Sequence, residues 1–198
     1  MAIRDLLWAC PLCATTGGLR ANRRGDRCHA CGAGFRRDLG ASILAVTESG
    51  ERTRLSPAQW LERLPPIEPA SLPSELGPER VSVRMAVRKQ AVRQGRELIG
   101  WLDRFGPGRH GTLRLTRDRL QFDAPDGSTE WPLDRITVVQ PTSSKLQLAA
   151  SHMPVAAIRF STGSVRFWEE IVREAVRRTW RANGRGEITE FHPRITTR

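Results

Sequence analysis

The chain has no long apolar stretch. No window among its 198 residues approaches the roughly 20 consecutive apolar residues that a membrane-spanning helix needs. The opening segment, residues 1–8, is too short and too charged for a secretory signal peptide. Cysteine is scarce, and its four residues form two Cys-x-x-Cys pairs instead of a disulfide framework, which indicates a reducing compartment. We therefore expect a cytoplasmic protein, with or without peripheral attachment to the inner face of the membrane.

Lysine is almost absent, because the 32 basic residues include only Lys89 and Lys145. The formal net charge is nevertheless +11, and the isoelectric point is about 11.2. A charge of this size predicts an anionic partner, which can be nucleic acid, anionic lipid or an acidic protein. The preference for arginine fits a functional surface and the codon bias of a GC-rich genome equally well, and the sequence does not separate the two.

The chain also lacks a recognisable catalytic constellation. None of its four histidines has a serine, cysteine or paired carboxylate at a spacing typical of a nucleophile or an acid–base pair. Asp118, Asp123 and Asp126 lie in predicted turns, where aspartate serves the backbone. No glycine-rich phosphate loop opens a helix. We therefore predict that the protein is not an enzyme.

Four cysteines are the most informative residues present. The pair Cys10 and Cys13 is separated by 14 residues from the pair Cys28 and Cys31, a spacing that predicts one tetrahedral Zn²⁺ site. Four thiolates leave no open coordination position, so the predicted zinc is structural. The alternatives are a redox pair or free thiols. His29 lies inside the second pair, but four cysteines make it redundant as a ligand.

The segments around these cysteines resemble a zinc ribbon. Residues 14–27 read as a short hairpin, and residues 42–46 are a plausible third strand of a small antiparallel sheet. The resemblance covers residues 1–50 and implies a metal-stabilised domain, because so short a segment buries little apolar surface. Residues 51–78 are predicted to be a short helix, capped by Ser56 with Pro57 in its first turn, followed by a proline-rich linker.

The second half of the chain predicts short strands and one helix. Strands are expected at residues 81–87, 112–115, 120–122, 129–133, 136–140, 146–149 and 155–161. Residues 89–101 fit a helix or a continued strand, and residues 104–111 are predicted to form a loop. Apolar residues from Trp168 to Trp180 recur at helical spacing, which predicts an amphipathic helix over residues 164–181.

Residues 111–122 and 131–136, followed by a closing strand and a helix that carries Trp168, are similar to a bacterial pleckstrin-homology-like (PH-like) domain of the GRAM type. This resemblance, over residues 79–183, implies a strongly bent antiparallel barrel capped by the helix. It also implies a role in binding lipid headgroups or protein segments. Residues 184–198 are then a tail, either an added strand or a disordered peptide. The expected fold class is mainly β with one long C-terminal helix.

Two groups of basic residues are candidate sites for anions. Arg104, Arg109 and His110 lie among glycines that let the backbone approach a phosphate or lipid headgroup, although an ordinary turn explains them as well. Basic residues between the cysteine pairs form a candidate nucleic-acid site, with a solvated surface as the alternative. They are Arg20, Arg23, Arg24 and Arg27.

These observations predict a non-enzymatic adaptor or binding protein. Its zinc would be structural, and its PH-like module would contact an anionic membrane surface or a protein partner. The alternative is a nucleic-acid-associated zinc-ribbon factor. A third reading is a scaffold whose tail, near Phe191, docks on an enzyme. The sequence identifies neither the ligand nor the oligomeric state.

Overall fold

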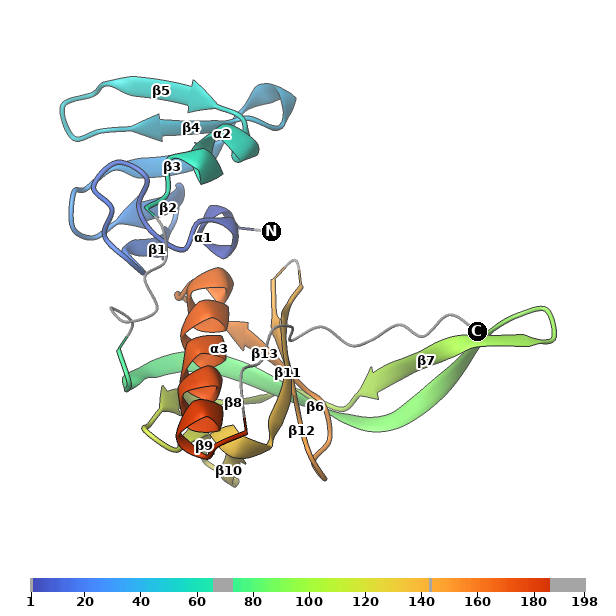
Figure 1. The fold of residues 1–198 in the computed structure, drawn as a ribbon. Coiled ribbons are helices and arrows are strands. Elements are labelled where there is room, and N and C mark those ends of the chain that lie inside the picture. The colour runs from blue at the N-terminus through green and yellow to red at the C-terminus, as the bar shows by residue number, and fades with distance from the viewer. Residues whose placement is uncertain (1, 66–72, 143, 186–198) are drawn as a thin grey trace.

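The protein was described from a computed structural model covering residues 2–65, 73–142 and 144–185. It is mainly β with one long C-terminal helix, as the sequence predicted, and contains two antiparallel sheets (Figure 1). The first sheet has five strands in the order β1-β2-β3-β4-β5. The second has eight strands, of which all but β7 follow the order β10-β9-β8-β6-β13-β12-β11. We call them the N-terminal sheet and the C-terminal sheet.

The N-terminal sheet is built from short strands in sequence order. Its elements are α1 (Ile3–Leu6), β1 (Leu19–Asn22), β2 (Gly25–Cys28), β3 (Gly34–Arg37), the 3₁₀ turn η1 (Leu39–Ala41), β4 (Ile43–Val46), β5 (Arg52–Leu55) and α2 (Pro57–Glu62). The predicted hairpin between the cysteine pairs is therefore confirmed as β1 and β2, and the third predicted strand as β4.

Helix α2 closes one side of this sheet. Its N-cap is Ser56, whose hydroxyl accepts a hydrogen bond from the backbone N–H of Gln59 at 3.3 Å, which confirms the predicted start. Trp60 is fully buried, packs edge-on against Phe35 with ring centroids 5.8 Å apart, and donates from Nε1 to the Ile43 carbonyl at 3.0 Å. Strand β5 is the last strand of the N-terminal sheet, and Trp60 of α2 belongs to the same apolar cluster as Phe35.

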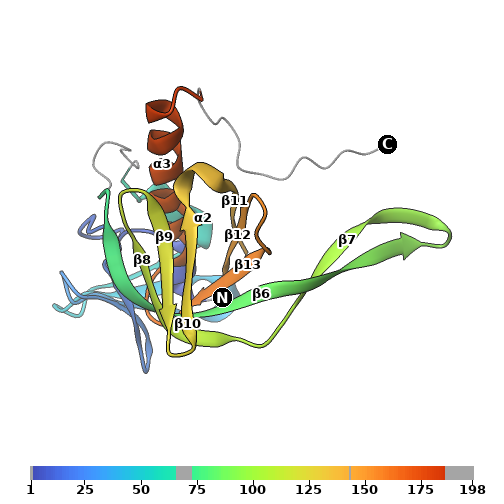
Figure 2. The ribbon, with the colours of Figure 1, turned by 90° about the horizontal axis from the view of Figure 1, so that it is seen from below.

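The C-terminal sheet follows the predicted strands closely. Its elements are β6 (Leu76–Gln94), β7 (Glu97–Phe105), β8 (Arg109–Leu115), β9 (Arg119–Ala124), β10 (Gly127–Pro132), η3 (Leu133–Arg135), β11 (Ile136–Pro141), β12 (Leu146–Ala150), β13 (Ala156–Phe160) and α3 (Val165–Ala182). Strand β6 pairs with β8 on one edge and with β13 on the other, so it joins the two halves of a curled sheet (Figure 2).

Helix α3 packs along this curled sheet and completes its core. Ser164 caps it by accepting a hydrogen bond from the backbone N–H of Phe167 at 3.2 Å. Trp168 is only 2% exposed and stacks on Phe160 of β13, with ring centroids 5.4 Å apart. The predicted amphipathic helix is therefore confirmed. No helix in the described part of the chain has the length and apolar character needed to cross a bilayer.

Residues 89–111 settle one open prediction and correct another. Residues 89–101 are strand, because β6 continues to Gln94 and turns into β7. The loop expected over 104–111 is present but shorter, at residues 106–108, since β7 reaches Phe105 and β8 begins at Arg109. Cross-strand hydrogen bonds to β6 extend both strands into this glycine-rich segment. Residues 66–72 of the expected linker and the tail from residue 186 lie outside the described residues, and β6 begins at Leu76, inside the expected linker.

The two sheets meet at the N-terminal end of α3. Helix α1 lies against α3, and the Ser164 hydroxyl is 3.4 Å from the Leu7 carbonyl oxygen. The Phe167 ring lies so close to Gly17 that a Cβ placed there would come within 2.9 Å of it. A φ of +59° also favours glycine at this position. The segment leading to the first cysteine pair is therefore part of the contact between the sheets.

Candidate metal centre

The four cysteines come together beside β1 and β2. Cys10 follows α1, and its backbone N–H donates to the Thr15 carbonyl at 3.0 Å. Cys28 is the last residue of β2, and its N–H donates to the Ala33 carbonyl at 2.8 Å. Each first cysteine is thus held by backbone hydrogen bonds across its own turn, and both are buried.

The sulfur atoms have the spacing of a tetrahedral metal site. All four Sγ atoms lie within 4.8 Å of one another, and the distances from Cys10 to Cys31 and from Cys13 to Cys28 are both 3.7 Å. A tetrahedron with metal–sulfur bonds of about 2.3 Å has edges of about 3.8 Å. A disulfide would require about 2.05 Å, and all four cysteines are free. The donor set therefore fits a tetrathiolate metal ion.

The two cysteine turns repeat one backbone design. In the first, the N–H of Ala14 donates to the Cys10 carbonyl at 2.8 Å; in the second, that of Gly32 donates to the Cys28 carbonyl at 3.0 Å. The residue after each second cysteine has positive φ, +59° at Ala14 and +69° at Gly32. This left-handed residue closes each turn and lets both sulfur atoms of a pair point to one centre.

Two arginines of the β1–β2 hairpin donate hydrogen bonds to backbone carbonyls next to these turns. Arg20 of β1 donates from Nη1 to the Gly17 carbonyl at 2.8 Å, just after the first turn. Arg27 of β2 donates from Nε to the Gly32 carbonyl at 2.9 Å and is 3.1 Å from Glu48. Both residues were predicted as nucleic-acid ligands, and both make hydrogen bonds within the metal-binding segment.

The sulfur atoms differ in their acid–base properties. Burial raises the pKa of Cys10 and that of Cys31. Cys13 is exposed; burial opposes its ionisation, but hydrogen bonds from the Thr15 side chain and backbone outweigh it and lower its pKa to about 6. Four thiolates cannot be held this close without a compensating cation, so the cluster ionises fully only when a metal replaces the protons.

His29 lies next to the cluster but outside it. Its Nδ1 is 2.8 Å from the Gly18 carbonyl oxygen, and the ring is exposed. The group of side chains that can share one ion contains the four cysteines and not His29. This arrangement agrees with the expectation that the histidine is redundant.

A buried ion pair fixes α1 over the hairpin beside the cysteines. Arg4 Nη1 is 2.8 Å from Asp26 Oδ1, and the Arg4 backbone N–H donates to Asp26 Oδ2 at 3.0 Å. The Asp26 side chain is only 3% exposed. Helix α1 is followed by Leu7 and Trp8, both buried. The apolar residues that precede the first cysteine therefore cover the metal centre, with their position set by this pair.

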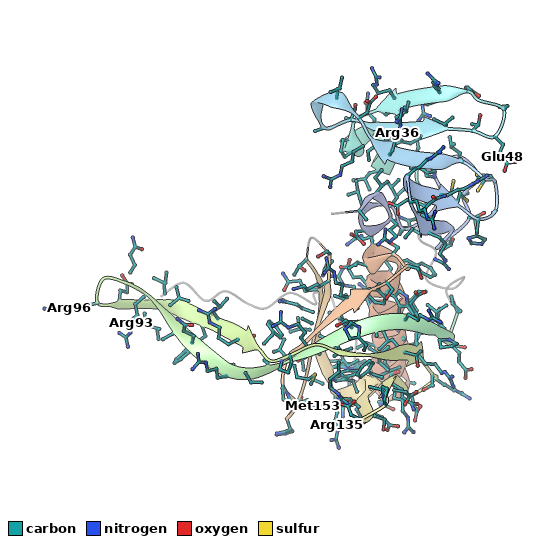
Figure 3. All side chains as sticks on the ribbon, turned by 180° about the vertical axis from the view of Figure 1, so that it is seen from behind. Arg36, Glu48, Arg93, Arg96, Arg135 and Met153 are labelled. Carbon is teal, nitrogen blue, oxygen red and sulfur yellow. The ribbon has the colours of Figure 1, made fainter. Side chains whose placement is uncertain are left out.

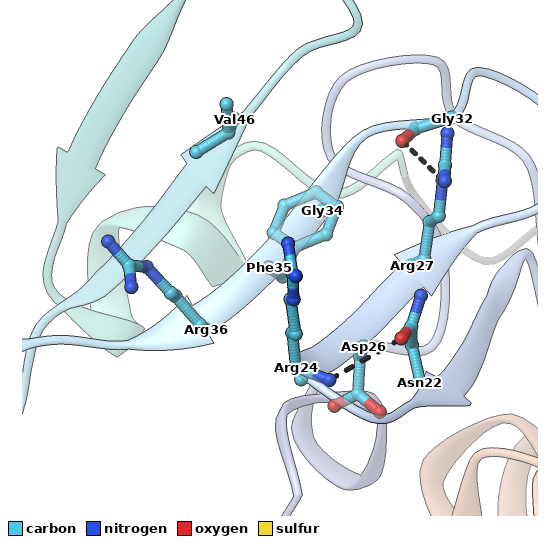
Figure 4. A pocket seen from close by; sticks show the side chains of 10 residues that line it. Asn22, Arg24, Asp26, Arg27, Gly32, Gly34, Phe35, Arg36 and Val46 are labelled. Atoms are coloured by element: carbon cyan, nitrogen blue, oxygen red, sulfur yellow. Dashed lines mark hydrogen bonds between the residues drawn. The ribbon is translucent and has the colours of Figure 1, made fainter. Parts of the chain in front are cut away.

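The hairpin arginines also border a shallow hollow of about 260 Å³ on the solvent face of the N-terminal sheet. Arg24 and Arg36 rise on either side of it, and Gly34 leaves the centre open (Figure 4). Arg23 and Arg24 lie in the turn between β1 and β2, and both are exposed. Of the predicted basic residues, Arg24 and Arg27 line this hollow, together with Arg36.

The second predicted anion site is dispersed. Arg104 lies in β7 and donates to the Gln90 side chain. Arg109 in β8 makes a two-pronged contact with Asp126, with nitrogen–oxygen distances of 2.8–3.0 Å, and this hydrogen bonding lowers the pKa of that carboxyl. His110 is exposed on the same strand, and adjacent strand residues face opposite sides. Anion binding by these three residues stays a prediction.

Sequence reasoning missed the largest exposed apolar group. It lies on β6 and β7, in the segment where helix and strand had both been considered. The available signal was the presence of Leu98, Ile99, Trp101 and Leu102 within five residues, too dense for one face of a strand.

The chain was compared with models of protein families, with curated protein sequences and with solved structures, and none of them matches.

Proposed function

We propose that the protein is a non-enzymatic adaptor that combines a structural zinc ribbon with a PH-like module contacting an anionic membrane surface. The spacing of the four sulfur atoms carries the zinc part of this proposal, since 3.7 Å is the edge of a zinc–sulfur tetrahedron. A protein surface with the same acidic character is the other partner class that the charge allows.

The chemistry of the cysteine cluster favours zinc. Four thiolates in a tetrahedral arrangement are typical of Zn²⁺, and they fill its coordination shell. When bound, such an ion would cross-link the two cysteine turns. Cys10 and Cys28 would hold it from the buried side, and Cys13 and Cys31 from the more exposed side. A closed shell offers no position for a reactive water, which supports a structural role.

The PH-like part is supported by the curled sheet. Strands β8, β9 and β10 on one side of β6 and β11, β12 and β13 on the other form the bent sheet that this family resemblance implies, and α3 packs on it. The net charge of +11 supports an anionic partner.

Elemental analysis of the protein purified without added metal tests the zinc part. We expect one zinc per chain, lost in the Cys10→Ser and Cys28→Ser variants and kept in His29→Ala. Stoichiometric iron in place of zinc, or a metal-free folded N-terminal sheet, would contradict the proposal.

Vesicle sedimentation tests the membrane part. We expect the full chain to pellet with vesicles that contain phosphatidylserine and to remain in solution with phosphatidylcholine alone. Salt should release it, since the Debye length shrinks from about 10 Å at 0.1 M to about 3 Å at 1 M. Equal binding to both kinds of vesicle, or to neither, would overturn this part.

One observation favours nucleic acid as a second candidate. Arg20 pairs in register with Arg27, and the same row continues through Gly34 and Val46 to Arg52, so these arginines share the solvent face of the sheet. Residues on one face at strand spacing suit a phosphate backbone. Replacing Arg24 and Arg36 with Glu should then weaken duplex or single-strand binding and flatten its salt dependence. Unchanged affinity would exclude this face.

A further inference from the structure

Strands β6 and β7 continue beyond the C-terminal sheet as a two-stranded arm, residues 87–104. Up to Met85, β6 is paired with β13, and up to Val83 with β8. From Arg88 to Gln94 it pairs with β7 alone. The arm projects far from both sheets (Figures 1 and 2) and carries Arg93 and Arg96 near its tip (Figure 3).

Large apolar side chains are concentrated on this arm. Trp101 is 62% exposed and Ile99 is 57% exposed. Of the nine large apolar residues exposed in the described part of the chain, the six on the arm are Val87, Val92, Leu98, Ile99, Trp101 and Leu102. A contiguous exposed apolar group of this kind marks a binding surface, because scattered single residues are the usual pattern.

These side chains occupy both faces of the ribbon. A β-bulge shifts the register between Val92 and Arg93, so Leu98, which is opposite Arg93, faces the same side as Trp101, while Val92 and Leu102 face the other side. Trp101 is in register with Ala91, and Leu102 with Gln90. A flat partner surface would cover one face and leave the other in water. The distribution instead fits a medium that surrounds the ribbon.

The arm is also positively charged. It has five basic side chains against two acidic ones, Glu97 and Asp103. None of the five is in an ion pair with a described residue. Arg88 and Arg104 even lie opposite each other in register, and like charges placed directly across two strands repel. An anionic partner would relieve this repulsion.

We propose that the arm enters the interface of an anionic lipid bilayer, with its apolar residues among the upper acyl chains and its arginines at the lipid phosphates. This inference deepens the proposed membrane contact and rests on it. Tryptophan beside arginine is the composition favoured at the membrane–water boundary. A second copy of the chain would bring together two arms of the same charge. Nucleic-acid phosphates would pair with the arginines but leave Ile99 and Leu98 in water.

The backbone limits how deep the arm can go. Both outer edges of a two-stranded ribbon present unpaired N–H and C=O groups, which the hydrocarbon core does not tolerate. The headgroup region still holds water that satisfies these groups. The arm is therefore an interfacial anchor and does not span the membrane.

Trp101 provides a direct readout in the full, metal-loaded protein. Of the six tryptophans it is the most exposed; Trp8, Trp60, Trp131 and Trp168 are buried and Trp180 is partly buried. With phosphatidylserine vesicles we expect a blue-shifted emission and protection from iodide. Both effects should vanish in Trp101→Phe, which should still sediment. If iodide still quenches Trp101 fluorescence while the protein sediments with the vesicles, the arm does not enter the bilayer. This result would contradict the inference about the arm and leave the proposed function intact.

Paired variants test the two-sided arrangement. Leu98→Ser with Trp101→Ser alters one face, and Val92→Ser with Leu102→Ser alters the other. We expect each pair to weaken vesicle binding about tenfold, with no effect from Leu39→Ser, a residue 86% exposed on the N-terminal sheet. If only one of the two paired variants loses vesicle binding, the arm makes a one-sided contact with a protein. Self-association of the wild type that the variants abolish would indicate a second copy. Either result would overturn the inference, whereas failure of the wild type to bind vesicles would overturn the proposed membrane contact itself.

Discussion

The two sheets are stabilised in different ways. The C-terminal sheet encloses a continuous apolar core in which Trp131, Leu120 and Ile158 are fully buried, completed by Trp168 of α3. The N-terminal sheet has a much smaller cluster, centred on Phe35 and Trp60, and two of its members are the cysteines Cys10 and Cys28. Small domains bury too little apolar surface to fold alone, so the proposed metal ion would supply the missing free energy in the N-terminal sheet, whereas apolar burial supplies it in the C-terminal sheet.

Removal of the metal should affect the two sheets unequally, and this is the largest effect we expect. Structural zinc contributes about 10–16 kcal/mol in small domains, so chelation should unfold β1–β5 while the C-terminal sheet stays folded. Hydrogen exchange with and without a chelator measures this directly. Retained protection of the β2 and β3 amides after verified metal loss would show that the first sheet does not depend on the ion.

Truncation of Trp168 should destabilise the C-terminal sheet and leave the N-terminal sheet unaffected. Trp168→Ala removes a side chain that is 2% exposed and should lower the free energy of unfolding of the C-terminal sheet by about 3–5 kcal/mol. The cysteine cluster should keep its metal. Trp101→Ala, at an exposed site, is the matched control and should change stability by less than about 0.5 kcal/mol. Denaturant titration measures the free energy of unfolding of both variants, and metal analysis checks that they keep the ion. Equal losses of unfolding free energy in Trp168→Ala and Trp101→Ala would contradict the description of the core.

Contact between the two sheets should couple their stabilities. The expected effect is smaller than that of metal removal or of Trp168→Ala. Phe167→Ala removes the ring that packs on Gly17 and should cost about 1–2 kcal/mol. It should also make the melting temperature of the C-terminal sheet independent of metal. Phe105→Ala, at the base of the arm, is the control that leaves this contact intact. A metal dependence that persists in Phe167→Ala would show that coupling runs through another contact.

The smallest expected effect lies within the metal centre. Ala14 has φ of +59°, a conformation that costs a residue with a Cβ about 1–2 kcal/mol. Ala14→Gly removes this strain but adds freedom to the unfolded chain, so we expect a net gain below about 1 kcal/mol. Gly32→Ala, at the equivalent position of the second turn, should destabilise instead. Thermal unfolding of the metal-bound variants checks both signs, and a loss in Ala14→Gly would contradict the strain argument.

Sequence reasoning performed best where local spacing determines structure. The four cysteines, the Ser56 cap and the Trp168 stripe each depend on residues a few positions apart, and each was placed correctly. It made the loop over residues 104–111 too long, because pairing with β6 extends β7 and β8 and leaves only residues 106–108 as loop. It also did not find that Arg109 is held by Asp126, since the contact joins separate strands.

The amino-acid sequence alone determined the four-cysteine cluster, the mainly β fold class and the amphipathic helix, because each is encoded by a short pattern of residue types. Only the tertiary structure decided that β6 extends beyond the rest of its sheet as part of an exposed arm and that α1 contacts α3. Exposure and long-range contact depend on which other segments are near in space, and no local pattern of side chains carries that information.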